Sequence, residues 1–206
     1  DPTALPVEYR ILDSGLGYVR VSSNSDDFDL IDELFWRALS SFEYHEVKGV
    51  IVDLRQNDGG SLVGFAGYLT DQPIELARLA YYERGVGAFE PEGPPETIEP
   101  LSDPFSFDRL AVLVGQGCFS ACELEAYGLS RLPGAVVVGD APTAGVVAEV
   151  SEGQYQLPED LWLQAPTGRY LAPDGQLFLE GRGVAPTLRV PLDAKTLLDS
   201  GDPVLE

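Results

Sequence analysis

The sequence predicts an α/β fold built on a mostly parallel sheet with crossover helices and short strands near its C-terminal end. Three short, continuous apolar runs, at residues 49–52, 110–114 and 135–138, are typical of strands that are buried on both faces. Helical patterns stand between these runs, which is the order of strand–helix–strand units in a parallel sheet. After residue 140 the signals are short strands and turns, such as Pro173-Asp174-Gly175.

A hairpin and a helix are expected before the first buried strand. Residues 7–12 and 16–21 are apolar runs on either side of the turn sequence Asp13-Ser14-Gly15, which predicts two antiparallel strands. Residues 25–27, Ser-Asp-Asp, offer an N-cap and acidic residues for the positive end of a helix. Apolar residues then recur at helical spacing: Ile31, Leu34, Phe35, Ala38, Leu39 and Phe42.

The remaining segments are assigned from composition and periodicity. We predict helices over residues 61–69 and 120–131, while residues 71–82 leave helix and strand open. Residues 85–107 hold five prolines and three glycines, which predicts a long loop that borders a functional site. We expect residues 1–206 to form a single core domain, to be part of a longer protein, and to contain no PDZ domain.

Charge excludes several classes of partner. The chain carries 34 acidic and 13 basic residues, a formal net charge of −21. Nucleic acids and anionic membrane surfaces require basic clusters, and none occurs here. No apolar run is long enough to span a bilayer, so membrane insertion is not expected. The acidic balance favours solubility, and a preference for basic polypeptide substrates is the alternative interpretation.

The two cysteines, Cys118 and Cys122, lie four positions apart on either side of a serine. A disulfide at that spacing would strain the start of a helix, so we interpret both as small buried residues without a bridge. No histidine lies near them in the sequence, and we expect neither a metal site nor a cofactor.

Two corners between a strand and the following segment carry residues suited to chemistry. Residues 53–60 end in Gly59-Gly60, whose backbone N–H groups could form an oxyanion hole or simply an ordinary glycine turn. Residues 115–123 place Ser120 at the start of a predicted helix. There the positive end of the helix dipole favours an alkoxide or oxyanion, although a serine at that position can also act only as an N-cap.

Taken together, these corners resemble the C-terminal-processing (tail-specific) serine peptidase family. The resemblance runs from about Tyr9 to Val190 and implies an α/β core like that of crotonases and Clp proteases. The segments that carry it match in residue type and in order: Asp-Leu-Arg-Gln-Asn-Asp-Gly-Gly at 53–60, Ser-Ala-Cys-Glu at 120–123, Val-Val-Val-Gly-Asp at 136–140, Thr-Ala-Gly at 143–145, Pro-Asp-Gly at 173–175 and Glu-Gly-Arg-Gly-Val-Ala-Pro at 180–186.

The resemblance implies a role for each matching residue. Ser120 would attack the peptide carbonyl, and the backbone N–H groups of Gly60 and Ala121 would bind the oxyanion. It also implies a polypeptide substrate and an extracytoplasmic location, either secreted or periplasmic. Four further residues match family positions and are interpreted as framework: Asp53, Arg55, Asn57 and Glu123.

The general base departs from the family pattern. The common branch of the family carries a lysine after the serine in a Phe-Gly-Lys-Gly motif, whereas residues 144–148 here read Ala-Gly-Val-Val-Ala. A minority branch that includes the tricorn protease is similar in this core, uses an upstream histidine, and carries a glutamate that Glu180 matches. We therefore predict that Glu180 supports a base from outside this chain, supplied by an upstream part of the same protein or by an oligomer.

Three alternatives remain open at this stage. His45, the sole histidine, could be the base, but it precedes the first buried strand and should lie far from Ser120. The chain could be a catalytically silent relative that binds ligands or acts as a scaffold, like the interphotoreceptor retinoid-binding proteins. Esterase-like chemistry is the third alternative.

Overall fold

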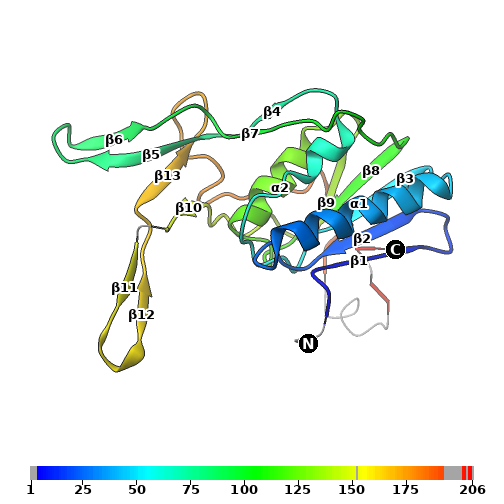
Figure 1. Ribbon diagram of the computed structural model, residues 1–206, viewed down its shortest axis with the longest axis horizontal. Coiled ribbons are helices and arrows are strands. Elements are labelled where there is room, and N and C mark those ends of the chain that lie inside the picture. Colours follow the sequence, from blue (N-terminus) through cyan, green and yellow to red (C-terminus); the bar gives the residue numbers. More distant parts are fainter. Residues whose placement is uncertain (1–3, 152, 193–200, 203, 206) are drawn as a thin grey trace.

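A six-stranded, mostly parallel sheet forms the centre of the computed structural model, which describes residues 4–151, 153–192, 201–202 and 204–205 (Figure 1). Strands β1 and β2 form an antiparallel hairpin, and every other neighbouring pair is parallel. The predicted sheet and its leading hairpin are therefore confirmed. In spatial order the strands are β1 (Val7–Ile11), β2 (Gly17–Val21), β3 (Gly49–Asp53), β8 (Arg109–Leu113), β9 (Val136–Gly139) and β14 (Leu188–Arg189).

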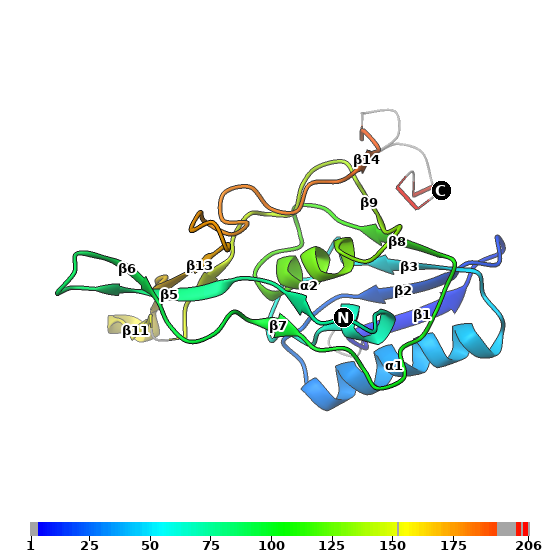
Figure 2. The same cartoon turned by 90° about the horizontal axis from the view of Figure 1, so that it is seen from above.

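Two α-helices pack on one face of this sheet (Figure 2). Helix α1 (Phe28–Tyr44) begins where the Asp27 carboxylate accepts a hydrogen bond from the Leu30 N–H at 3.0 Å. The buried residues of α1 follow the spacing seen in the sequence: Ile31, Phe35, Ala38, Leu39 and Phe42. Helix α2 (Ala121–Ser130) is buried along most of its length, so the sheet and the surrounding loops enclose it.

The opposite face of the sheet carries a smaller apolar cluster. Side chains alternate between the two faces along each strand, so Tyr18, Ile51 and Leu113 point away from the helices. Val138 and Val204 complete this cluster. The main core therefore lies on the helix side of the sheet, and it includes Cys122 and Leu124 from the first turn of α2.

An extended arm of smaller sheets reaches away from the body of the molecule (Figure 1). A four-stranded sheet and one two-stranded sheet make up the arm, and a second two-stranded sheet, of which Ile98 lies in the main core, connects it to the body. Their bounds are β4 (Ile74–Glu75), β5 (Arg78–Glu83), β6 (Ala88–Pro91), β7 (Thr97–Ile98), β10 (Ala148–Glu149), β11 (Gln154–Gln156), η2 (Pro158–Asp160), β12 (Trp162–Gln164) and β13 (Gly168–Leu171).

The prediction of a structureless loop over residues 85–107 was wrong. Within it β6 pairs with β5, and β7 pairs with β4. The turn between β5 and β6 uses Gly87 at φ 74°, and Pro91 stands at the end of an edge strand, where no ladder donor is required. Proline and glycine therefore mark the ends of strands here.

The predicted helix over residues 61–69 is shorter than expected. A 3-10 helix, η1 (Phe65–Leu69), occupies only its second half. Gly64 adopts the left-handed conformation at φ 87°, which prevents a regular helix from starting earlier. The chain's first three residues and Lys195 lie outside the described residues.

Candidate active site

Ser120 occupies an unusual backbone conformation at the first turn of α2. Its φ of 59° and ψ of −128° lie in a backbone region that residues other than glycine rarely adopt. Its side chain makes no capping hydrogen bond to the helix. Its backbone N–H instead donates to the carbonyl oxygen of Val146 at 2.9 Å. The alternative of a simple serine N-cap is therefore not what the structure contains.

The turn formed by Gly59 and Gly60, called the glycine turn below, packs directly against this serine. Both residues have positive φ, at 81° and 132°. A Cβ atom on Gly59 would lie 2.8 Å from the Cβ of Ser120, and one on Gly60 would lie 2.2 Å from the carbonyl carbon and oxygen of Asn24. Glycine is needed at both positions, because a side chain would collide with backbone and push the turn away from the serine.

Ser120, Gly60 and Ala121 line one cavity of about 350 Å³. Within the described residues, the N–H groups of Gly60 and Ala121 donate to no protein acceptor. Three of the four residues predicted for the site are therefore brought together. Glu180 does not line this cavity, and its Oε2 accepts a hydrogen bond from the N–H of Val147, a cavity-wall residue, at 2.8 Å.

Glu123 holds the loop that passes beside Ser120. Its carboxylate accepts hydrogen bonds from the N–H groups of Gly145 at 2.8 Å and Val146 at 2.7 Å, and from the hydroxyl of Thr143. The side chain is fully buried. The interpretation of Glu123 as a framework residue agrees with this geometry, since its contacts fix the backbone of two loop residues and the side chain of a third.

Glu125 is a buried residue that the sequence interpretation missed. Its carboxylate accepts hydrogen bonds from three consecutive backbone N–H groups, those of Val63, Gly64 and Phe65. Burial raises its pKa to about 7, while these hydrogen bonds and one from Asn24 act in the opposite direction. The sequence did hold a signal for this buried carboxylate, because Glu125 is an acidic residue among the apolar residues of a predicted helix.

Carboxylates and a tyrosine form the outer wall of the Ser120 cavity. Tyr170 donates a hydrogen bond to Glu96 at 3.3 Å, and Glu149 lines the same wall. Burial and the charge of Glu149 raise the pKa of Glu96, and burial raises the pKa of Tyr170. No lysine, arginine or histidine is among the described residues that line this cavity. The cavity is therefore electronegative and lacks a basic side chain from the described part of the chain.

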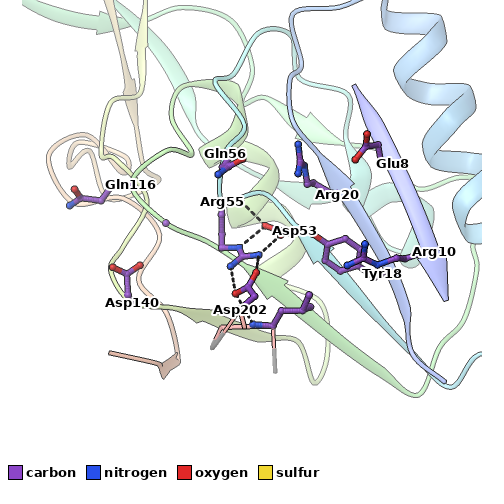
Figure 3. A pocket seen from close by; sticks show the side chains of 12 residues that line it. Glu8, Arg10, Tyr18, Arg20, Asp53, Arg55, Gln56, Gln116, Asp140 and Asp202 are labelled. Atoms are coloured by element: carbon purple, nitrogen blue, oxygen red, sulfur yellow. Dashed lines mark hydrogen bonds and ion pairs between the residues drawn. The ribbon is translucent and has the colours of Figure 1, made fainter. Parts of the chain in front are cut away.

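A second cavity, of about 500 Å³, lies on the sheet face opposite the helices (Figure 3). Charged side chains from β1 and β2 line it, including Glu8, Arg10 and Arg20. It shares no lining residue with the cavity at Ser120. Its chemistry is therefore separate from that of the serine.

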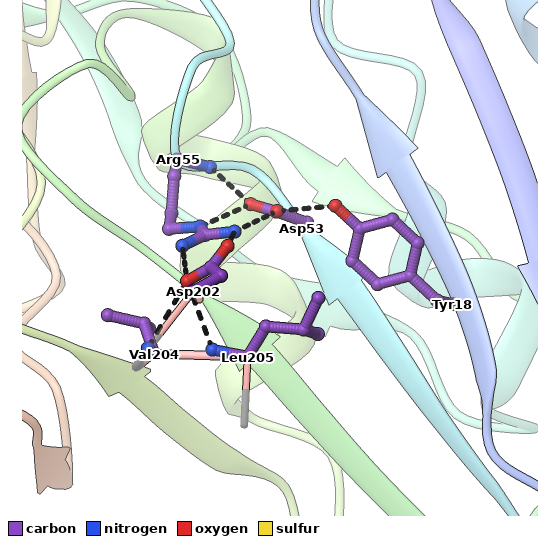
Figure 4. A network of polar contacts seen from close by, with 6 residues as sticks. All are labelled: Tyr18, Asp53, Arg55, Asp202, Val204 and Leu205. Carbon is purple, nitrogen blue, oxygen red and sulfur yellow. Dashed lines mark hydrogen bonds and ion pairs between the residues drawn. The ribbon is translucent and has the colours of Figure 1, made fainter. Parts of the chain in front are cut away.

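Asp53 and Arg55, two of the residues interpreted as framework, form an ion pair at the wall of this second cavity (Figure 4). Arg55 donates to both carboxylate oxygens of Asp53, at 3.0 and 2.7 Å, and binds Asp202 with two further hydrogen bonds. Tyr18 donates to Asp53 at 2.7 Å, and burial together with this bond raises the pKa of Tyr18 to about 12. The network anchors the carboxyl end of β3, from which the glycine turn departs.

Cys118 and Cys122 form a disulfide, so the interpretation of two unbridged cysteines was wrong. Their Cα atoms are 5.4 Å apart, which lies within the usual range for a disulfide. Ser120, between them, leaves helical geometry, so Cys118 lies outside the regular helix to which Cys122 belongs. Both cysteines are fully buried, as expected.

His45 lies at the end of the sheet opposite Ser120. It is the C-cap of α1, just before the amino end of β3, whereas Ser120 follows the carboxyl end of β8. Strands β3 and β8 are parallel, which sets these two ends apart. His45 is therefore not positioned to act on Ser120 from within this chain.

Membrane-spanning helices and metal sites are both absent from the described residues. None of the helices found there combines the length and the apolar character needed to cross a membrane. The same part of the chain contains no group of three or more histidine, cysteine, aspartate or glutamate residues arranged to hold a metal ion.

Comparison with solved structures shows what the chain resembles. A Parabacteroides merdae protein aligns with a TM-score of 0.77 and 24% identity, over 98% of this chain and 62% of that one. A photosystem II D1 C-terminal processing protease aligns at 0.63 and 21%, over 90% and 48%. Mature CPAF aligns at 0.69 and 18%, over 92% and 50%. The chain therefore spans about half to two thirds of these proteins, and the likeness is one of fold.

The sequence itself was compared with protein families and with curated proteins. No curated protein matched it. The model of one family, described as peptidase family S41, matches residues 15–190, which is most of the chain and includes both corners that meet at Ser120. The chain belongs to peptidase family S41.

Proposed function

We propose that this chain is the catalytic core of a serine endopeptidase that cleaves polypeptides through Ser120. The observation that carries the proposal is the meeting of a strained serine with two backbone N–H groups, those of Gly60 and Ala121, in one cavity. A reactive hydroxyl beside unengaged donors is the arrangement that acyl transfer requires. Membership of the family supports peptidase activity.

The chemistry follows from the positions of these groups. The Oγ of Ser120 attacks the scissile carbonyl carbon, and the carbonyl oxygen becomes an oxyanion that the N–H groups of Gly60 and Ala121 bind. The N-terminal end of α2 adds the positive end of its dipole beneath this oxygen. Collapse of this intermediate breaks the scissile C–N bond, and the amine product leaves with the proton taken from Ser120, which gives the acyl-enzyme. Water then attacks the acyl carbonyl, which releases the carboxylic acid product and restores the serine.

In this proposal the proton of Ser120 passes to a base from outside this chain. No described basic side chain lines the cavity, and His45 lies at the other end of the sheet. Glu180 uses Oε2 to hold Val147, while its Oε1 has no hydrogen-bond partner among the described residues. We assign to this second oxygen the task of orienting a base from an upstream part of the protein or from a neighbouring subunit.

The walls of the cavity favour a basic side chain in the substrate. Glu96 and Glu149 line the same space as Ser120, and no cation among the described residues neutralises it. Burial makes the negative charge of Glu96 costly, and a bound lysine or arginine would offset that cost. A polar, open cavity also favours the peptidase over the silent ligand-binding module, for which a closed apolar cavity is expected.

The disulfide supports a proposal for the location of the protein. A disulfide between Cys118 and Cys122 persists in oxidising compartments and is rare in a reducing cytosol. We therefore propose an extracytoplasmic location, either secreted or periplasmic.

Labelling with a fluorophosphonate probe tests the proposed function. The probe is applied to this chain and to the full-length protein, each with its Ser120→Ala variant. Labelling of the full-length protein alone, abolished by Ser120→Ala, is the expected result. If neither form is labelled, the catalytically silent alternative replaces the peptidase. If the isolated 206-residue chain is labelled as fast as the full-length protein, the proposal of a base from outside this chain is wrong.

A further inference from the structure

Glu125 connects the helix that carries Ser120 with the backbone that follows the glycine turn. It is the fifth residue of α2 and has no solvent exposure. Its Oε1 accepts the N–H groups of Val63 at 2.6 Å and Gly64 at 2.8 Å, and its Oε2 accepts that of Phe65 at 2.9 Å. One carboxylate thus fixes three successive peptide units just beyond the glycine turn.

Asn24 extends this contact to both sides of the glycine turn. Its side-chain N–H₂ group donates to the carbonyl of Ser61 at 2.9 Å and to Glu125 at 3.4 Å. Its backbone N–H binds the carbonyl oxygen of Gly59, and its carbonyl oxygen accepts the N–H of Ser61, both at 2.9 Å. Its Oδ1 accepts from the side chain of Asn57 at 2.6 Å. The glycine turn is therefore held in a network that ends on Glu125.

We propose that Glu125 is a positioning residue whose ionised carboxylate holds the glycine turn in place for oxyanion binding, and whose protonation loosens that turn. The proposal rests on the proposed function, because it concerns the oxyanion site of the same reaction. Glu125 does not line the cavity. It acts through the backbone of residues 63–65 and through the side chain of Asn24.

The charge of Glu125 matters because all its contacts are with donors. An ionised carboxylate offers acceptors to four N–H groups, whereas a protonated one turns an oxygen into a hydroxyl donor that opposes one of them. Each such hydrogen bond is stronger when the acceptor is charged. Protonation therefore weakens the attachment of residues 63–65 to α2.

The groups around Glu125 contain no cation that would keep it ionised at low pH. In the described residues it forms no ion pair, and the facing charged and titratable groups are Tyr68 on η1 and, beyond it, Asp32 on α1. The negative charge of Glu125 helps to raise the pKa of Tyr68. Burial raises the pKa of Glu125 itself to about 7, so its charge changes within the neutral range.

Nuclear magnetic resonance on the 206-residue chain tests the proposal without any need for catalysis. The side-chain carboxyl resonance of Glu125 and the amide resonances of Gly60 and residues 63–65 are followed from pH 5 to pH 9. We expect one common inflection near pH 7. Local opening that breaks these hydrogen bonds while Glu125 stays buried is favoured by protonation, unlike global unfolding, which exposes Glu125 to water. We therefore also expect hydrogen-exchange protection of residues 63–65, corrected for the intrinsic rate, to fall by about 10-fold from pH 8 to pH 6.

Two variants separate positioning from general structure. Glu125→Gln keeps the shape of the side chain but does not titrate, so the inflection at Gly60 should vanish. Glu90→Gln, on the exposed strand β6, should leave it unchanged. If Gly60 shows no inflection while Glu125 titrates, or if Glu125 titrates at its ordinary pKa, the proposal is wrong. Should Glu125→Gln fail to fold, the titration of the unmodified chain decides alone. Labelling of Ser120 tests the proposed function independently.

Discussion

The backbone N–H of Ser120 donates a hydrogen bond to the carbonyl oxygen of Val146 at 2.9 Å. The N–H of the same Val146 donates to Glu123 on α2 at 2.7 Å. The loop is thus tied at one residue to both the serine and the helix that follows it. This double attachment helps to hold Ser120 in its unusual backbone conformation.

Replacing Glu123 should therefore disturb the serine without touching it. In Glu123→Gln, an amide N–H₂ group would face the N–H donors of Gly145 or Val146 and leave a buried donor unsatisfied. We expect a loss of about 1–3 kcal/mol in the free energy of unfolding and slower labelling of the full-length protein. Urea denaturation measures the first effect. The exposed Glu33→Gln, which breaks only a surface pair with Arg37, should change stability by less than about 1 kcal/mol. Equal losses in both variants would contradict the framework role.

The glycine turn should not tolerate a side chain at its second position. In Gly60→Ala, the Cβ atom would meet the carbonyl group of Asn24 at 2.2 Å, on a backbone with φ at 132°. We expect a loss of more than about 2 kcal/mol in the free energy of unfolding, measured by thermal or urea denaturation. Gly93→Ala is the matched control, because Gly93 also has positive φ but nothing within 4 Å of the added atom, and should lose about 1 kcal/mol. A Gly60→Ala chain as stable as the control would show that the turn can move.

The raised pKa of Glu125 makes the stability of the chain depend on pH. Its pKa is about 7 in the folded protein against an ordinary 4.5, so the folded state binds the proton more tightly. This contribution is fully present below about pH 4.5 and is lost as pH rises through 7, a change of roughly 3 kcal/mol. Urea denaturation at pH 5 and pH 8 should show this loss in the unmodified chain and not in Glu125→Gln. An identical pH dependence in the two proteins would exclude Glu125 as its source.

The disulfide between Cys118 and Cys122 should stabilise the corner that holds Ser120. A bridge that closes so short a loop contributes about 2 kcal/mol by its effect on the unfolded chain. A mild reductant should therefore lower the melting temperature of the chain and slow the labelling of Ser120 in the full-length protein. Thiol titration of the unreduced, denatured chain should find no free cysteine. Two free thiols in that assay would restore the original interpretation of unbridged residues.

The carboxylates beside Ser120 should determine which peptides bind. With the full-length Ser120→Ala protein, a peptide bearing lysine near the scissile bond should bind about 10-fold more tightly than its leucine counterpart. The double variant Glu96→Gln/Glu149→Gln should abolish this preference, whereas Glu90→Gln should retain it. Fluorescence polarisation with labelled peptides gives both dissociation constants. A preference for leucine, or a lysine preference unaffected by the double variant, would remove the acidic wall as its cause.

Local patterns in the sequence were sufficient for most elements of the central fold. Helix α1 was predicted from the spacing of its apolar residues, because one face of a helix on a sheet must be buried. Strands β3, β8 and β9 were predicted from continuous apolar runs, because both faces of a parallel sheet are covered. The order of these elements places strand ends and the start of α2 at one edge, and the resemblance to the tail-specific peptidases assigned Gly60 and Ser120 to one site there.

The tertiary structure decided what depends on contacts between distant segments. The strands inside residues 85–107 form because β5 and β4 pair with them, which no local composition reveals. The disulfide depends on backbone angles at Ser120 that only the neighbouring loop imposes. Glu125 looked like one more residue of a helix, but its three backbone partners lie about sixty positions away. The periodicity of apolar residues shows which face of a helix or strand is buried. Whether a carboxylate can be buried depends on the hydrogen-bond donors that folding brings to it, and these come from distant parts of the sequence.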